Sequence, residues 1–333
     1  MRVSVFLKVQ LFLLVLLLGL AKPSAYGQQS FLEPADTLNK ARFWTVTLGG
    51  AAIYTGFSIG LYNTWYKDFP RTNLRSFDDW GEWNQMDKAG HLFTAYIESN
   101  LSFGGALWTG MDRRSAMWTA AGVGMLLQTT VEVMDGFSAQ WGWSWSDAAF
   151  NTAGVGLFVG QELLWEEQRI LMKVSNRFPR YSEAPLPATN GEGQSNIKEW
   201  AEDIYGAGLA ERFLKDYNGQ TIWASVNIKS FLREKDNFFP GWLNIAFGYG
   251  VDNVFGAYGN SWQRDDGAGF RLDPIDYPRY RQYYISFDVD MSRLPIKNRF
   301  LRTLAGALNW IKIPSPTLEF NSLGEVKFHP FYW

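Results

Sequence analysis

The chain has 333 residues, of which 47% are hydrophobic and 17% aromatic, and its formal net charge is -2. That length fits two domains of roughly 150 residues each, and the near-neutral charge excludes nucleic-acid binding, which needs a basic face. The absence of cysteine excludes disulfides, thiol catalysis, thiolate metal sites and lipidation on a cysteine.

The first 27 residues have the pattern of a secretory signal peptide. Arg2 and Lys8 precede an apolar run over 11–20, and small residues around Ala25 and Gly27 fit a cleavage site. The alternative is an uncleaved anchor, but an apolar run of about 12 residues is short for a membrane span. We therefore expect an exported protein of the cell envelope, on the periplasmic side or at the outer membrane.

Residues 28–178 are predicted to form a bundle of four apolar helices. The predicted helices cover 43–66, 85–111, 115–133 and 147–174. The first contains no charged residue and is long enough to span a bilayer, which takes about 20 apolar residues. Recurrent glycines such as Gly154 and Gly156 predict close packing between helices. We expect the bundle to be associated with a membrane or to span it.

Residues 179–195 contain Pro, Gly and Ser without periodicity, so we place a linker there. Residues 196–217 have an apolar period of 3.6, which predicts an amphipathic helix. The period then changes to two, which predicts strands. The predicted strands cover 222–228, 243–251, 283–289, 318–320 and 326–328, with one short helix over 299–311. The predicted fold class is therefore α+β: the four-helix bundle is followed by a smaller β-rich domain over 196–333.

Ionisable and polar residues occur in pairs at the ends of the predicted helices. The pairs are Asp87 and His91, with Lys88 between them, Glu132 and Asp135, and Asp147 and Asn151. Charge in apolar helices costs free energy unless the groups pair. Because antiparallel helices with short connections bring these three ends together, we predict that the pairs converge. The alternative is that Asp87 caps its helix and each helix end is solvated separately.

Two functions are compatible with such a polar group. The preferred one is a non-enzymatic envelope protein, structural or partner-binding, in which the polar residues fix the helix register. The alternative is a membrane-proximal hydrolase or transferase that acts on a lipid or lipid-linked head group. His91 would be the general base, oriented by Asp87, with Glu132 as the third candidate catalytic residue.

The remaining members of the group have supporting roles in the enzymatic hypothesis. Lys88, Asp135, Asp147 and Asn151 are candidates for substrate contacts or structural support, and Glu132, Asp147 and Asn151 are the groups that would hold a substrate or a divalent metal. The sequence identifies no cofactor, and no phosphate-binding loop, GxSxG or HExxH motif is present. The expected partners are membrane lipid and an envelope protein, and nucleic acid is excluded.

The strings MDKAGHLFTAY, ExxD and SxSDxxxNxxG resemble the YfiM-like predicted periplasmic lipoprotein family, a domain of unknown function. The resemblance covers roughly 40–175 and implies an envelope location without an established activity. The helical part is also similar to the VanZ-like membrane family, whose pattern matches Asp87, Lys88, His91, Glu132, Asp147 and Asn151. The chain departs from the first family in having no cysteine for a lipid anchor.

Overall fold

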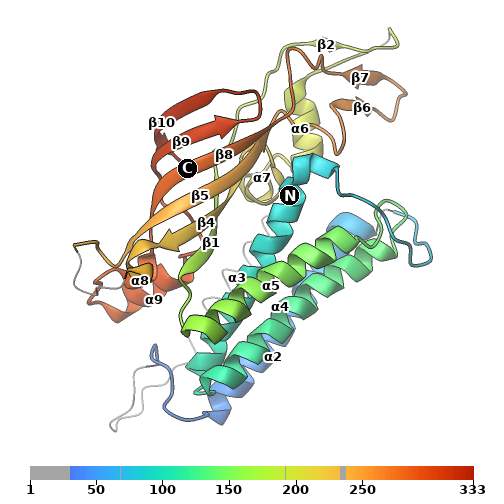
Figure 1. The fold of residues 1–333 in the computed structure, drawn as a ribbon. Helices are drawn as coiled ribbons and strands as arrows, with labels where there is room; N and C mark the ends of the chain where they lie inside the picture. Colours follow the sequence, from blue (N-terminus) through green and yellow to red (C-terminus); the bar gives the residue numbers. More distant parts are fainter. Residues whose placement is uncertain (1–30, 68, 192, 233–237) are drawn as a thin grey trace.

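The computed structural model describes residues 31–67, 69–191, 193–232 and 238–333 (Figure 1). It contains an N-terminal helical region followed by a C-terminal sheet, which confirms the predicted α+β class. The predicted signal peptide over 1–27 lies outside the described residues.

Within the described residues, the helical region contains four long helices. They are α2 (Lys40–Leu61), α3 (Met86–Trp108), α4 (Arg113–Gly136) and α5 (Trp145–Trp165). Helix α3 is central and packs against both α4 and α5. A Cβ atom placed on Gly154 of α5 would lie 2.3 Å from the backbone oxygen of Leu92 in α3, so these two helices meet backbone to backbone.

Helix α2 lies on the outside of this unit, and none of its residues is buried. It is tied to α4 by a hydrogen bond of 2.8 Å between the hydroxyls of Tyr54 and Thr130. The length of 43–66 allowed a membrane span, and α2 continues directly into the short π-helix η1 (Tyr62–Tyr66), but the spanning alternative is not borne out. No helix in the described ranges combines the length and apolar content that crossing a bilayer requires.

The main sheet has six antiparallel strands in the order β1-β4-β5-β8-β9-β10. Their bounds are β1 (Ile170–Asn176), β4 (Gln220–Asn227), β5 (Leu243–Asp252), β8 (Tyr280–Val289), β9 (Ser315–Asn321) and β10 (Val326–Tyr332). Two small antiparallel pairs join β2 (Leu186–Pro187) to β3 (Gln194–Ser195) and β6 (Ser261–Gln263) to β7 (Gly269–Arg271).

The sheet begins earlier in the chain than predicted. Residues up to 174 were expected to continue the fourth helix, but α5 ends at Trp165 and Glu166 is left-handed, with φ of 50°. Strand β1 follows and pairs with β4. Nearly every residue of β1 is buried, so both of its faces are covered and the alternation that marks a half-exposed strand is absent.

The predicted helix over 196–217 is two helices, because Gly206 adopts a positive φ of 85° and ends the first. The short helices are α6 (Ile197–Tyr205), α7 (Leu209–Lys215), α8 (Ile228–Phe231), α9 (Arg299–Ala307), η2 (Glu82–Gln85) and η3 (Met291–Arg293). Helix α9 is shorter than the predicted 299–311.

The outer strands of the sheet carry apolar side chains on the solvent face and polar side chains inside. An exposed apolar row crosses four paired strands at Phe247, Ile285, Leu318 and Phe328. On the inner face, the fully buried Lys173 of β1 lies 2.8 Å from Asp288 of β8. Thr221 of β4 bonds Tyr332 of β10 over 3.0 Å. The sheet therefore curls so that non-neighbouring strands meet through polar groups.

One hydrophobic core joins the helical region to the first strands of the sheet. Tyr96 of α3 packs in the same cluster as Val174 of β1 and Ile222 of β4. The opposite edge of the sheet lies away from the helices (Figure 1). The division into two domains at 179–195 stays a prediction. Tyr96 and Val174 precede this segment and Ile222 follows it, so the shared core contains residues from both sides.

Candidate functional site

Polar residues from three helices and one loop meet where α3 and α5 begin and α4 ends. The structure brings together six of the seven residues proposed from the sequence, and adds Asp79 from the loop before α3. The polar cluster consists of Asp79, Asp87, Lys88, His91, Glu132, Asp147 and Asn151.

The start of α3 is positioned by an unusual turn. Trp83, Asn84 and Gln85 all have positive φ angles, between 49° and 63°. Non-glycine residues adopt this conformation at a cost, and it persists where the surroundings impose it. The C-terminal region does so here, since the backbone N–H of Trp83 bonds Ala257 O over 2.7 Å and Arg281 donates to the side chain of Gln85 over 2.5 Å.

The start of α5 is fixed by a conventional N-cap. The hydroxyl of Ser144 accepts the backbone N–H of Asp147 over 3.0 Å, which satisfies one free donor of the first turn. The same hydroxyl donates to Asp79 over 2.6 Å, and the hydroxyl of Ser146 does so over 2.7 Å. The cap therefore orients Asp147 and anchors the loop that carries Asp79.

Lys88 is the centre of the cluster, and its side chain is completely buried. Its Nζ lies 2.5 Å from Asp79, 2.6 Å from Asp147 and 3.1 Å from Asp87. A buried ammonium needs such partners, because leaving water is costly for an unpaired charge. Each carboxylate comes from a different element, so Lys88 holds the loop, α3 and α5 together.

His91 lies one helical turn beyond Asp87, and 17% of its side chain is exposed. Its Nδ1 lies 3.1 Å from the side-chain oxygen of Asn151 and 3.6 Å from Glu132. Its Nε2 lies 3.8 Å from Asp87 and 3.7 Å from Asp147. Both ring nitrogens therefore face acceptors, which is the arrangement that suits a protonated imidazole.

Glu132 joins α4 to the cluster, whereas Asp135 lies beside it. Glu132 accepts a hydrogen bond from the amide of Asn151 over 3.2 Å and faces the backbone N–H of Ser144 at 3.4 Å. Asp135, one turn further along α4, instead accepts the hydroxyl of Tyr66 over 2.7 Å. Asp135 is thus the one sequence-proposed residue for which the structure gives no direct bond to the other six.

The pKa values of His91, Asp147 and Glu132 in the cluster are raised. Burial alone would lower the pKa of His91, but the charges of Asp87, Asp147 and Glu132 outweigh burial and raise it. Burial raises the pKa of Asp147 to about 8, and it also raises that of Glu132, against the opposing charge of His91. These shifts all favour protonation, so the cluster binds protons more tightly than the same side chains would in water.

Asp79 and Lys88 are pushed toward their charged forms. Burial would raise the pKa of Asp79, but hydrogen bonds from Asp147, Lys88 and Ser144 hold it below its usual range. Burial would lower the pKa of Lys88, but the charges of Asp87 and Asp147 raise it. The pair is therefore ionised over the ordinary pH range.

Three members of the site were missed by sequence reasoning. Asp79 lies in a loop next to Asp78, and the sequence does not show which of the two acids joins the cluster. Ser144 lies three residues before Asp147, the expected start of the fourth helix. Tyr217, whose hydroxyl donates to Asp87 over 3.0 Å, comes from the far side of the predicted linker. Only Ser144 had a local signal, since a serine three residues before Asp147 fits an N-cap.

Asp87, His91 and Asp147 have the donor set of a small divalent-metal site. One ligand atom from each can be chosen so that all lie within 4.8 Å of one another. The same two carboxylates also face the ammonium of Lys88, which occupies their other oxygens. The cluster thus already contains a bound cation in the form of its own lysine.

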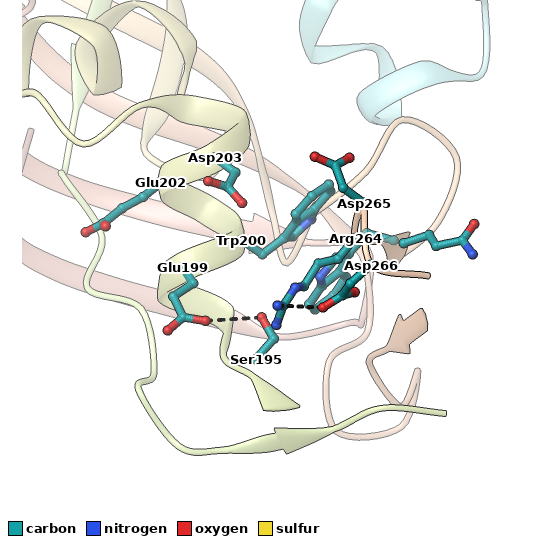
Figure 2. A pocket seen from close by; sticks show the side chains of 10 residues that line it. Ser195, Glu199, Trp200, Glu202, Asp203, Arg264, Asp265 and Asp266 are labelled. Carbon is teal, nitrogen blue, oxygen red and sulfur yellow. Dashed lines mark hydrogen bonds and ion pairs between the residues drawn. The ribbon is translucent and has the colours of Figure 1, made fainter. Parts of the chain in front are cut away.

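A separate hollow of about 580 Å³ lies between α6 and the β6–β7 pair (Figure 2). Its lining is acidic, with Glu199, Glu202, Asp203, Asp265 and Asp266 around Trp200 and Trp262, whose rings stack 5.1 Å apart. Arg264 pairs with Asp266 over 2.7 Å. No residue of the polar cluster lines this hollow, and acidic groups alone do not identify a ligand.

Comparison with known proteins bears on the segment that carries the cluster. Residues 77–160 match the family model described as "Predicted periplasmic lipoprotein (DUF2279)". The match supports the family resemblance and confirms the predicted location of the exported chain in the cell envelope. The matched segment contains every residue of the polar cluster. The similarity to the VanZ-like family stays a prediction. No curated protein and no solved structure matches the chain.

Proposed function

We propose that the protein is a structural, non-enzymatic component of the cell envelope, in which the polar cluster locks the helical region into one arrangement. The observation that carries this proposal is the complete burial of Lys88 among Asp79, Asp87 and Asp147. A buried, fully paired charge adds little net stability, but it disfavours other packings, in which the charge would be unpaired.

The state of His91 supports the same proposal. A general base must be unprotonated at the working pH, with one nitrogen free to accept a proton. Here the neighbouring carboxylates raise the pKa of His91. Both of its nitrogens also face acceptors within the protein. This geometry favours a cationic imidazole that ties α3 to α4 and α5.

The second candidate is the head-group hydrolase or transferase, with His91 as general base and Asp87 and Glu132 as its supporting acids. One observation favours it: part of the His91 ring is exposed, beside three carboxylates. A substrate or a divalent metal bound by these carboxylates would offset their charge, and the lowered pKa of His91 would free its ring to act as a base. An envelope protein as binding partner remains a proposal compatible with either function.

The experiment that separates the two functions compares His91→Gln with Lys88→Met in cells that depend on the protein. A structural role predicts that both variants lower the melting temperature and that cellular function falls in step with the amount of folded protein. An enzymatic role predicts that His91→Gln is folded, stable and correctly localised, yet inactive. That last result would overturn the structural proposal.

A further inference from the structure

Helix α9 is amphipathic, yet it packs little of its apolar face against the protein. Phe300, Leu301, Leu304 and Leu308 share one face of the helix by their spacing, and 40 to 52% of each is exposed. None of the residues of α9 is buried. A helix of 9 residues is marginal in water on its own, so its apolar face is expected to rest on another surface.

The segment around α9 is basic. No Asp or Glu occurs between Asp290 and Glu319. Lys297, Arg299 and Arg302 are all exposed, and the two arginines lie on the face opposite the apolar side chains. Arg299 also contacts Glu33 over 3.2 Å. The surface around this helix is therefore complementary to an anionic partner.

The neighbouring end of the sheet extends the apolar surface. Strand β8 runs directly into η3 and the segment before α9 (Figure 1). Two outward side chains of this strand, Ile285 and Phe287, are exposed, as is Leu318 of β9. The acids of the same strand end, Asp288 and Asp290, are buried on the inner face. The outer face therefore presents apolar groups and cations, with Glu33 paired to one of the cations, Arg299.

We propose that α9 docks on a lipid surface that contains anionic head groups. Its apolar face inserts at the boundary between head groups and acyl chains, and Lys297, Arg299 and Arg302 pair with lipid phosphates. An apolar face backed by arginines is the pattern of helices that lie in a membrane interface. The long arginine side chains can reach the head groups while their stems cover apolar surface.

A second copy of the chain fits this surface less well. In a two-fold contact through the apolar face, Arg299 and Arg302 lie on the opposite face and would gain no anionic partner. An anionic lipid surface instead supplies the opposite charge over its whole area. Each basic residue near such a surface strengthens binding roughly five-fold.

The lack of cysteine allows a direct test on the exported, full chain. Leu304→Cys is labelled with a polarity-sensitive fluorophore and mixed with phosphatidylcholine vesicles, with or without phosphatidylglycerol. The emission is expected to shift to the blue with the phosphatidylglycerol vesicles, and the shift should weaken at high salt because screening weakens the charge attraction. The matched control is Leu209→Cys in α7, an exposed leucine on another short helix, which should not shift.

A second variant tests the charges without altering buried residues. Arg299→Gln combined with Arg302→Gln is expected to weaken binding to phosphatidylglycerol vesicles by roughly 25-fold while the fold is retained. Three results would overturn the proposal: no shift at position 304, an equal shift at 209, or undiminished binding by the double variant. A shift that depends on protein concentration without vesicles would also overturn it and assign the face to a second copy.

Discussion

The hydroxyl of Tyr217 donates a hydrogen bond of 3.0 Å to Oδ1 of Asp87, across 130 residues of sequence. Tyr217 lies between α7 and β4, so the bond connects the C-terminal region to the polar cluster. The other oxygen of Asp87 lies 3.1 Å from Lys88. Each oxygen of this carboxylate therefore has its own partner, one from each half of the chain.

We expect Tyr217→Phe to lower the free energy of unfolding by about 1 kcal/mol, the usual net value of one hydrogen bond, or somewhat more because the acceptor is charged. Urea denaturation measures the change. In a double-mutant cycle with Asp87→Asn, the two losses should not be additive. Additivity within about 0.3 kcal/mol would contradict a direct interaction between the two side chains.

Lys88→Met should destabilise the protein strongly, by about 3–5 kcal/mol, because it leaves Asp79, Asp87 and Asp147 buried without their cation. The midpoint of denaturation reports the loss. Lys198→Met is the control, since Lys198 is nearly half exposed and pairs with Glu183 at the surface. Its expected effect is small, because water screens an exposed pair. Equal effects of the two substitutions would argue against a central role for Lys88.

His91 should stabilise the protein more at low than at high pH. Its pKa is raised in the folded state, so the folded protein binds this proton more tightly than the unfolded chain does. The contribution is complete below about pH 6.5, the ordinary histidine value, and is lost as the pH rises through the folded-state value. NMR titration checks this, with His329→Gln used to assign the resonance, and a midpoint below 6.5 would contradict it.

Glu98→Gln should stabilise the protein at neutral and alkaline pH. Burial raises the pKa of Glu98 to about 7, although the hydrogen bond from Gln128, of 2.7 Å, opposes this shift. Wild-type stability therefore falls as the pH rises from about 4.5 to 7, while the variant avoids this loss. We expect a gain of about 1–3 kcal/mol above pH 7 and none below about pH 4. A gain independent of pH would point to another cause.

Two nearby glycines of α5 should respond in opposite directions to alanine. Gly154→Ala would place a Cβ 2.3 Å from the backbone of Leu92, and the expected cost is about 1–3 kcal/mol. Gly156 has open space around it, so Gly156→Ala should stabilise the helix by up to about 1 kcal/mol. Thermal unfolding of the two variants measures both effects. Similar shifts in the same direction would contradict the close approach of α3 and α5.

The helical spacing of the sequence was enough to predict the meeting of Asp87, His91, Glu132 and Asp147. Each of them lies near the end of an apolar helix, and antiparallel packing with short loops leaves few other arrangements. The catalytic roles assigned to them stay predictions. The strands β5 and β8 were also predictable, because one face of each is apolar and the other polar.

Other features had no local signal. Strand β1 is covered on both faces, so its sequence reads as part of the preceding helix. Gly154 and Gly156 are equivalent in sequence, yet only Gly154 meets a neighbouring backbone. Asp79 bonds Ser144 and Lys88 of other elements, and Tyr217 reaches Asp87 from the C-terminal region, so both residues join through tertiary contacts. Such contacts follow from the whole fold and cannot be inferred from periodicity or spacing.

The left-handed turn at Trp83, Asn84 and Gln85 has a consequence for how the protein matures. Its backbone is bonded by Ala257 and the side chain of Gln85 by Arg281, and both partners are synthesised and exported long after α3. The helices can form early, but the turn before Lys88 lacks its bond from Arg281 until β8 is in place. A chain cut short before β8 should therefore contain all the acids of the cluster and still fail to assemble it.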